Sequence, residues 1–205
     1  MHIQCFPLGE LQANCYFLIE NSNCLIIDPA DSAEFILEEV QRRNLTVKGM
    51  FATHGHFDHI LAAGEIQLSL GMLYQRELPL YIFEEDLFLI KRVKETALHF
   101  LNHVPQFLPI QELQFLKEGK MELEDFKFEV FHTPGHTPGS CCFYFPTDSA
   151  IFTGDTLFKE GVGDYSHKYS DKKLLFNSIK RILNLDEGTT IYPGHGEETL
   201  VQMEK

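Results

Sequence analysis

The sequence predicts an α+β fold in which two similar αβ halves stack their β-sheets face to face and carry helices on the outside. Two observations predict this fold. Strand and helix patterns follow each other over residues 2–100, and the same succession begins again at residue 120. The chain has 205 residues, of which 44% are hydrophobic. This is enough for the core of one domain spanning 1–205, and it excludes a disordered chain.

The first half alternates short apolar runs, which are typical of strands, with longer amphipathic segments, which are typical of helices. We expect Asp31 and Ser32 to cap the first helix, because short oxygen-bearing side chains bind the free amides of a helix start. We expect Gly71 to end the second helix. The predicted strands are 2–7, 14–20, 23–28, 47–53 and 80–83, and the predicted helices are 32–43, 58–71 and 84–100.

The second half opens with a stretch, 102–118, that contains Pro105 and Pro109 and shows neither pattern. We interpret it as a long loop and as the best candidate for a lid, because long loops in compact domains are usually functional or disordered. Strand patterns then resume. The predicted strands are 120–123, 126–132, 140–145, 149–153 and 189–192, and the predicted helix is 171–184.

The charge balance is acidic, with 17 Lys and Arg against 30 Asp and Glu and a net charge of −13. This excess opposes a nucleic acid or an anionic membrane as partner, because both attract a basic face. Residues 1–7 lack the basic and apolar pattern of a signal peptide, and no apolar run approaches the length of a membrane span. Five cysteines without a CxxC pair predict free thiols in a cytoplasmic protein.

A histidine-rich turn, Thr-His-Gly-His-Phe-Asp-His, follows directly on the apolar strand 47–53. His54 and His56 are two residues apart, so a tight turn lets both imidazoles converge on one ion. Asp58 and His59 continue into the start of a helix, from which they can reach a second ion. Three imidazoles and a carboxylate suit zinc, with iron or manganese as alternatives.

Three other strand ends each present one ligand-type residue on a glycine-bearing turn, where glycine allows the close approach that a metal centre needs. These residues are His136, Asp155 and His195. Any one of them alone is most simply a hydrogen-bonded loop residue. Four such strand ends together predict one metal-binding pocket.

The combined motif resembles that of the metallo-β-lactamase superfamily. It consists of HxHxDH, the histidine of TPGHTPGS, the aspartate of TGDTLF and the histidine of PGHG. Within the superfamily the chain is most similar to the glyoxalase II-like hydrolases, especially the short forms. The resemblance extends to the early NCYFLI and LIIDPA segments. It implies a four-layer αβ/βα sandwich of two mixed sheets, with the metal site between their upper edges.

The resemblance also implies a ligand set. One metal ion would be held by His54, His56 and His136, a second by Asp58, His59 and His195, and both would be bridged by Asp155. Two such ions can hold a shared water as hydroxide, which attacks a carbonyl carbon while the metals stabilise the developing charges. Asp58 is suited to orient this hydroxide and is therefore the predicted catalytic residue.

The predicted substrate is a small thioester or ester, as in the hydroxyacylglutathione hydrolases. Two departures from the glyoxalase II pattern weaken glutathione recognition. We expect the family's C-terminal helical region to be absent, and Asp164 stands where the family has a basic residue for a substrate carboxylate. A carboxylate there would repel such a substrate. The residues that could compensate for Asp164 or contact the substrate are Lys159, Tyr165, His167, Lys168 and Tyr169.

Other functions of the superfamily fit the sequence less well. Its secreted β-lactamases commonly have Cys at the position of Asp155, its RNase-processing members add nucleic-acid-binding parts, and its flavodiiron members add a flavin domain. Two alternatives stay open: a mononuclear iron persulfide dioxygenase with the same ligand spacing, and a non-enzymatic metal-binding module. Metal analysis separates the two enzymes, because about two zinc ions per chain favour the hydrolase and about one iron favours the dioxygenase.

Overall fold

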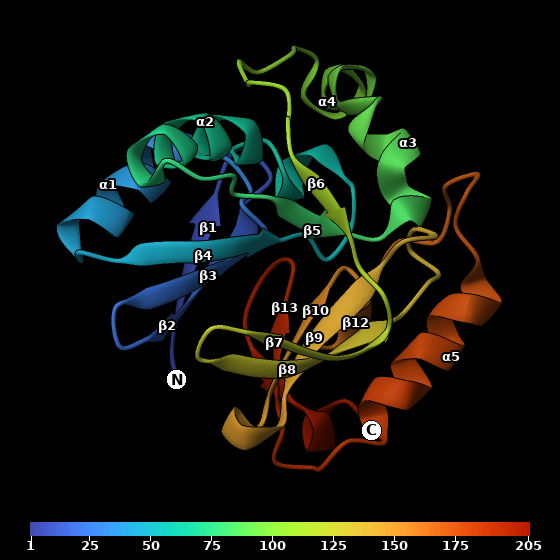
Figure 1. Cartoon of the computed structure of the whole chain (residues 1–205). Helices are drawn as coiled ribbons and strands as arrows, with labels where there is room; N and C mark the ends of the chain where they lie inside the picture. The colour runs from blue at the N-terminus through green and yellow to red at the C-terminus, as the bar shows by residue number, and fades with distance from the viewer.

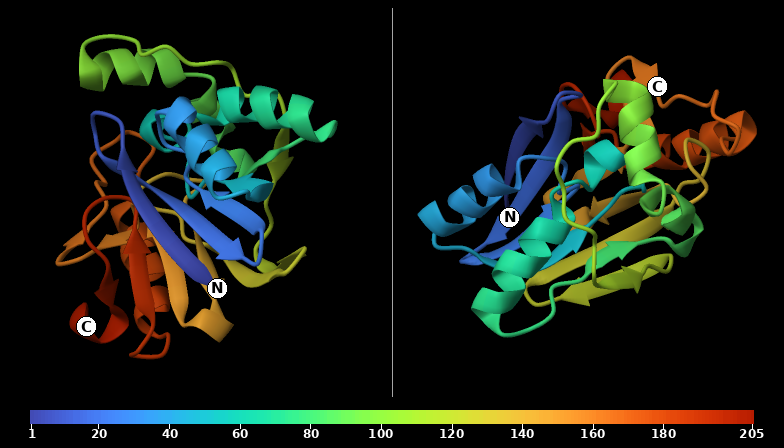
Figure 2. Two further views of the ribbon diagram at one scale, coloured as in Figure 1. Left: turned by 90° about the vertical axis from the view of Figure 1, so that its left-hand side faces the viewer. Right: turned by 90° about the horizontal axis from the view of Figure 1, so that it is seen from above.

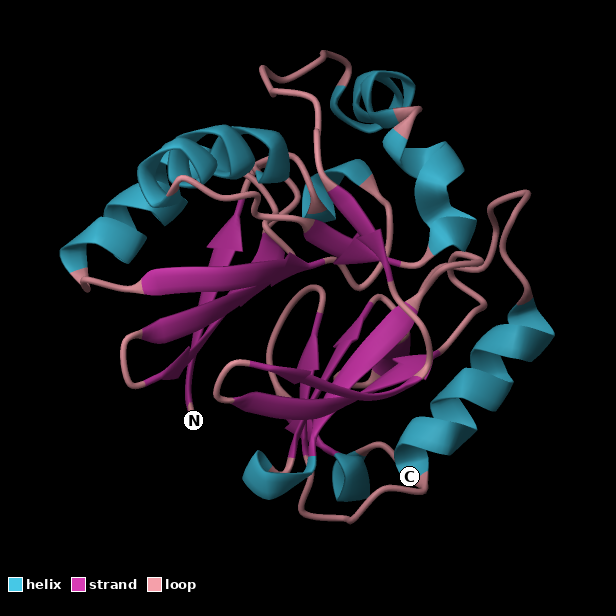
Figure 3. Cartoon of the chain, in the orientation of Figure 1, coloured by secondary structure: helices cyan, strands magenta, loops and turns pink.

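The computed structural model describes residues 1–205 and contains two six-stranded mixed β-sheets stacked against each other (Figures 1 and 3). The first sheet holds, in spatial order, β1 (His2–Leu8), β2 (Ala13–Glu20), β3 (Asn23–Ile27), β4 (Thr46–Phe51), β5 (Leu80–Ile82) and β6 (Leu113–Phe115). The second holds β14 (Thr199–Leu200), β13 (Thr190–Pro193), β10 (Ala150–Gly154), β9 (Cys141–Phe145), β8 (Phe126–His132) and β7 (Gly119–Leu123). A separate hairpin pairs β11 (Leu157–Phe158) with β12 (Gly161–Val162).

Helices cover the outer faces of both sheets. They are α1 (Ala33–Arg42), α2 (Ala63–Tyr74), α3 (Leu87–Ile90), α4 (Val93–Leu101) and α5 (Lys172–Leu183), with 3₁₀ turns η1 (Phe57–His59), η2 (Glu84–Asp86), η3 (Pro146–Asp148) and η4 (Val201–Met203). In Figure 2 the blue and blue-green helices α1 and α2 lie on one side of the stacked sheets and the orange helix α5 lies on the other. The predicted α+β sandwich is confirmed. No helix has the length and apolar character that crossing a membrane requires.

Strand direction decides where the strand ends meet. Strands β3 to β6 are parallel neighbours, and β10 pairs in parallel with β13. The other pairs of the two sheets are antiparallel. Because the carboxyl ends of parallel strands share one edge, the residues that follow β10 and β13 are brought side by side.

The core between the sheets is aromatic. The ring of Phe51 on β4 stacks on Tyr81 at a centroid distance of 4.6 Å and meets Phe128 and Phe143 of the second sheet edge to face, each at 5.4 Å. Edge-to-face packing at this range is favourable beyond the burial of area. Strand β2 serves both sides of its sheet, since Tyr16 faces this core while Phe17 packs beneath the helices.

Several element boundaries differ from the prediction. The predicted helix 58–71 is instead the 3₁₀ turn η1 followed by α2, because Asp58 and His59 turn into a polar cluster before the helix begins. Gly71 lies inside α2, and Gln75 ends the helix in the left-handed conformation with φ of 53°. Ser32 makes no side-chain cap on α1, because it is itself left-handed.

The predicted helix 84–100 is divided into η2, α3 and α4. Asp86 binds groups of two distant loops, and these tertiary contacts override the continuous helical pattern. The predicted loop 102–118 contains the short edge strand β6, which pairs in parallel with β5. The structure also adds β11, β12 and β14, each only two residues long.

Candidate metal centre

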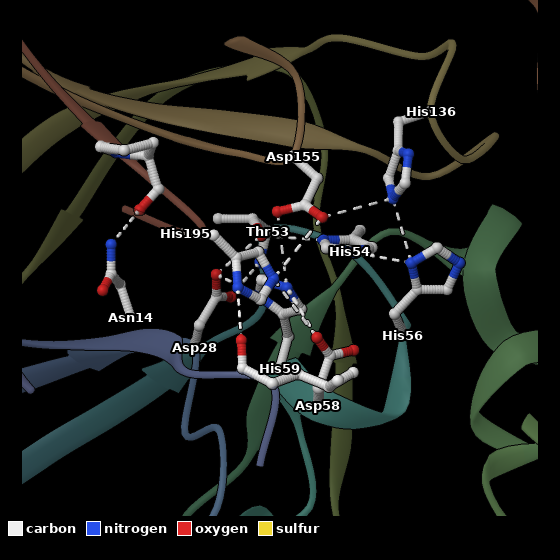
Figure 4. A network of polar contacts seen from close by, with 12 residues as sticks. Asn14, Asp28, Thr53, His54, His56, Asp58, His59, His136, Asp155 and His195 are labelled. Carbon is white, nitrogen blue, oxygen red and sulfur yellow. Dashed lines mark hydrogen bonds and ion pairs between the residues drawn. The ribbon is translucent and has the colours of Figure 1, made fainter. Parts of the chain in front are cut away.

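Seven polar side chains from four strand ends converge in one cluster (Figure 4). The chain after β4 supplies His54, His56, Asp58 and His59, and the loops after β8, β10 and β13 supply His136, Asp155 and His195. These are the seven residues that the motif singled out. His54, His59 and His136 are buried, and the other four are partly exposed.

One side of the cluster is formed by three imidazoles. Nδ1 of His56 lies 3.0 Å from Nε2 of His54 and 3.0 Å from Nε2 of His136. Oδ2 of Asp155 is 3.7 Å from the same nitrogen of His136. Three imidazole nitrogens with a carboxylate oxygen nearby are donors of the kind that zinc accepts.

The other side of the cluster is formed around Asp58. Its Oδ2 lies 3.3 Å from Nε2 of His195 and 3.6 Å from Nε2 of His59. Asp155 reaches this side too, since its Oδ1 is 3.5 Å from Nε2 of His59. A further group of His54, His59 and Asp155 connects the two sides. The two donor sets are therefore contiguous and share the Asp155 carboxylate.

Two buried polar atoms in the cluster lack a partner in the protein that a metal ion would supply. Nε2 of His59 and Oδ1 of Asp155 are buried and have no hydrogen-bond partner. A buried polar atom without a partner is costly, and such atoms are rare in native proteins. Divalent ions coordinated by these nitrogen and oxygen donors would satisfy both atoms, so the residues present fit the predicted metal pair.

Each of the five imidazoles also makes a contact through its other ring nitrogen, on the side away from the cluster. The outer contacts are His54 Nδ1 to Thr53 Oγ1 (3.1 Å), His56 Nε2 to Tyr169 Oη (2.8 Å), His59 Nδ1 to Asp28 Oδ2 (2.9 Å), His136 Nδ1 to the Asp164 carbonyl (2.7 Å) and His195 Nδ1 to the Leu11 carbonyl (3.0 Å). Such contacts fix ring orientation and tautomer, and they raise the basicity of the nitrogen that faces a metal.

Two buried carboxylates position the cluster, and neither role was predicted from the sequence. Asp28 accepts hydrogen bonds from the amide of Thr53 at 2.7 Å and from its hydroxyl at 2.8 Å, besides its contact with His59. Asp86 accepts from the amide of Gly55 at 2.8 Å and from the hydroxyl of Thr137 at 2.7 Å. The position of Asp28 directly after a predicted strand could have indicated a role at the site. No sequence feature indicates the role of Asp86, because its partners are distant in sequence.

The loop that carries His195 is fastened to the first sheet by Asn14. The Asn14 side-chain amide donates to the carbonyls of Pro193 at 3.0 Å and Gly196 at 2.9 Å, and its backbone amide donates to Gly194 at 2.8 Å. Gly194 lies so close to the cluster that a Cβ there would collide with the Asp155 carboxylate and the His59 ring. Glycine is required here because the backbone itself forms one wall of the site.

The titration of the cluster follows from burial and from its neighbours. Burial, reinforced by the surrounding imidazoles, holds the pKa of His54 and His56 well below the usual range, so both rings are neutral and can donate a lone pair. Although burial opposes it, the carboxylates of Asp58, Asp155 and Asp28 raise the pKa of His59 to about 10. The carboxylates on this side therefore favour a positive charge at His59, and a bound cation would take the place of the proton on its ring.

A pocket of about 310 Å³ opens beside the cluster. It is lined by Leu11, His56, Phe57, Asp58, Phe100, His136, Asp155, Asp164, His167 and His195. Of the predicted substrate contacts, His167 therefore lines the pocket, whereas Lys159 and Tyr165 do not. Lys159 is exposed and paired with Glu197 at 2.6 Å, and Tyr165 lies against Phe176. Phe100, near the end of α4, lines the pocket, whereas no residue of the segment 102–118, which was predicted as a lid, does so.

Sequence comparison gives a family match over nearly the whole chain. A family model described as the metallo-beta-lactamase superfamily matches residues 8–195. The hydroxyacylglutathione hydrolase GloC of Haemophilus influenzae is 34% identical over 209 residues, covering 100% of this chain and 95% of that protein. The probable metallo-hydrolase YqgX of Bacillus subtilis is 30% identical over 200 residues, covering 97% and 92%.

Solved structures with the same architecture include two that match over nearly their full length. The BLEG-1 B3 metallo-beta-lactamase superposes with a TM-score of 0.88 at 30% identity and covers 99% of this chain and 96% of its own. TTHA1623 in a di-iron-bound form superposes with a TM-score of 0.87 at 35% identity and covers 98% and 96%.

Proposed function

This chain belongs to the metallo-β-lactamase superfamily, and from that premise we propose that it is a binuclear metal-dependent hydrolase of small thioesters or esters, glyoxalase II-like in its reaction. The observation that carries the proposal is the position of Asp155. Its carboxylate oxygens lie 3.5 Å from Nε2 of His59 and 3.7 Å from Nε2 of His136, so one side chain reaches both donor sets.

The similarity to GloC supports a thioester as substrate, and the di-iron form of TTHA1623 supports two metals. We assign His54, His56 and His136 to one ion, Asp58, His59 and His195 to the other, and Asp155 to both. Zinc is the proposed metal, because the donors are mainly imidazoles; iron and manganese are the alternatives. The whole chain, 1–205, acts as one catalytic domain.

Metal ions bound here would supply Lewis-acid activation of a water and of the substrate carbonyl. The side chains of the protein would orient the attacking water and the substrate. Asp58 lines the pocket and can accept a hydrogen bond from the attacking water, which directs a lone pair toward the carbonyl carbon. The side chains of Leu11, Phe57 and Phe100 provide apolar wall for a small acyl group.

The test compares hydrolysis of thioesters, lactones, phosphodiesters and a β-lactam by the zinc-loaded protein. We expect thioesters to be cleaved fastest. His56→Ala and Asp155→Ala should each lower kcat/KM by more than about 100-fold, because ligand loss exceeds the effect of losing an outer contact. His2→Ala, which removes an exposed histidine far from the cluster in sequence, is the matched control.

Three results would contradict the proposal. The first is unchanged turnover in folded protein depleted of metal. The second is a β-lactam cleaved faster than every thioester. The third is about one iron per chain together with oxygen uptake on glutathione persulfide, which would identify the dioxygenase instead.

A further inference from the structure

The lining of the pocket constrains the charge of the substrate. Three of the ten lining residues are carboxylates, Asp58, Asp155 and Asp164, and none is lysine or arginine. Asp58 and Asp155 belong to the proposed metal ligands, and two divalent ions would more than offset their two charges. Asp164 is the one lining carboxylate that is not a proposed ligand, so its charge acts on a part of the substrate that is not bound to the metals.

Asp164 has a fixed position beside the cluster. Its carbonyl oxygen is the acceptor for Nδ1 of His136, at 2.7 Å. Its carboxylate accepts hydrogen bonds from the amide of Ser166 at 2.8 Å and from the hydroxyl of Ser166 at 2.9 Å. The one imidazole near it, Nε2 of His167, is 3.5 Å away. The carboxylate is thus oriented, half exposed, and without a lysine or arginine partner.

The neighbouring lysines do not neutralise Asp164. Lys159 pairs with Glu197, and Nζ of Lys172 lies over the Tyr165 ring at 5.0 Å from its centroid. Lys168 is exposed and does not line the pocket. Of the three residues expected to compensate for Asp164, Lys159 and Lys168 form no ion pair with it, whereas Nε2 of His167 lies 3.5 Å from its carboxylate.

Aromatic rings complete the same wall. Phe57 and Phe100 lie nearly parallel with centroids 6.2 Å apart, and the ring of His167 is 6.3 Å from Phe100. Aromatic faces beside a carboxylate are the surroundings that alkylammonium groups favour, through cation–π attraction and ion pairing. A carboxylate in this position would instead meet Asp164 as a like charge.

We propose that the substrate carries a positively charged, alkylammonium-like group next to the scissile thioester or ester, and that Asp164 selects for this charge. The inference rests on the proposed hydrolase function and specifies its substrate class. The net charge of −13, which two divalent ions would bring to −9, also favours a cationic substrate, because an acidic protein attracts cations at long range.

The test uses three thioacetates of similar size that differ in charge. They are acetylthiocholine, its neutral carbon analogue 3,3-dimethylbutyl thioacetate, and the anionic S-acetyl-3-mercaptopropanoate. We expect kcat/KM at low salt to fall in this order, with a ratio of about 10 or more between the cation and the anion, equivalent to about 1.4 kcal/mol. Asp164→Asn should reduce this ratio at least threefold. Glu160→Gln, which removes the same charge from the same segment outside the pocket, should leave it unchanged.

Binding of uncleavable thioether analogues of the three compounds, measured by calorimetry on the metal-loaded protein, reads the charge preference without turnover. Failure to cleave any thioacetate, combined with tighter binding of the cationic thioether, would count against the hydrolase and support the charge selection. A cation-to-anion ratio below about 3 in binding and in turnover would overturn the inference. A ratio that Asp164→Asn leaves unchanged would overturn it too.

Discussion

The amide of Gly139 donates a hydrogen bond to Oδ1 of Asp86 at 2.7 Å, in the fully buried contact between η2 and the loop that carries His136. Through its other oxygen the same carboxylate binds Gly55, between His54 and His56. Asp86 therefore connects the two loops that supply the three-imidazole side of the cluster.

Replacing this carboxylate should loosen both loops at once. Asp86→Ala leaves two buried amides unpaired, so we expect the free energy of unfolding to fall by about 2 kcal/mol or more. Urea unfolding measures this loss, and the metal content of the purified variant should fall with it. Glu85→Ala, an exposed neighbour in the same turn, is the control. Equal stability of the two variants would show that Asp86 does not hold the loops.

The contact between Asp28 and His59 should set metal affinity rather than fold stability alone. Asp28→Asn removes the anionic partner of Nδ1 and leaves the ring free to change tautomer, so we expect zinc affinity to fall by about 10- to 100-fold. Competition with a chromophoric chelator measures the affinity. Glu34→Gln, an exposed acid on α1, should bind zinc like the parent. Unaltered affinity in Asp28→Asn would reject the positioning role.

The five cysteines should differ sharply in reactivity. Cys5 is exposed, whereas Cys15, Cys24, Cys141 and Cys142 are buried, and desolvation raises the pKa of all five thiols. Because access separates Cys5 from the other four, a disulfide reagent should label one thiol first in the native protein and all five in denaturant. Cys5→Ser should abolish the fast phase. Rapid labelling of two or more native thiols would contradict the described burial.

An ion-pair cluster on α1 should make stability depend on pH in the acid range. Hydrogen bonds from Arg42 and then Arg43 lower the pKa of Glu39 to about 2. Since the folded-state pKa lies below the unfolded value near 4.5, the stabilisation is complete above that value and is lost as pH falls toward 2. We expect the parent protein to be more stable than Glu39→Gln at pH 6, with the difference shrinking below pH 4.5. A difference that is constant from pH 6 to pH 3 would exclude this linkage.

The sequence allowed prediction of the parts that depend on local patterns. Apolar periodicity identified most strands, and the strand-end motifs identified seven residues that do lie together, although their role as ligands stays a prediction. The strand β6 was missed because it is three residues long, lies at an edge and follows two prolines.

What the sequence could not reveal depends on long-range contacts. Asp28 is 31 residues from His59, and Tyr169 is 113 residues from His56, so neither partner can be found from spacing. Lys159 was a reasonable substrate contact by charge, yet its side chain pairs with Glu197 outside the pocket. Outer contacts of this kind are decided by the fold and not by the motif.

We propose that Asp155 joins two metal sites into one hydrolytic centre. Titration of the metal-free protein with zinc, with bound metal and thioacetate hydrolysis followed in the same sample, tests it most directly. We expect about two zinc ions to bind per chain and hydrolysis to reach its maximum only at the second equivalent. Full hydrolysis without added metal, or saturation at a single equivalent, would contradict it.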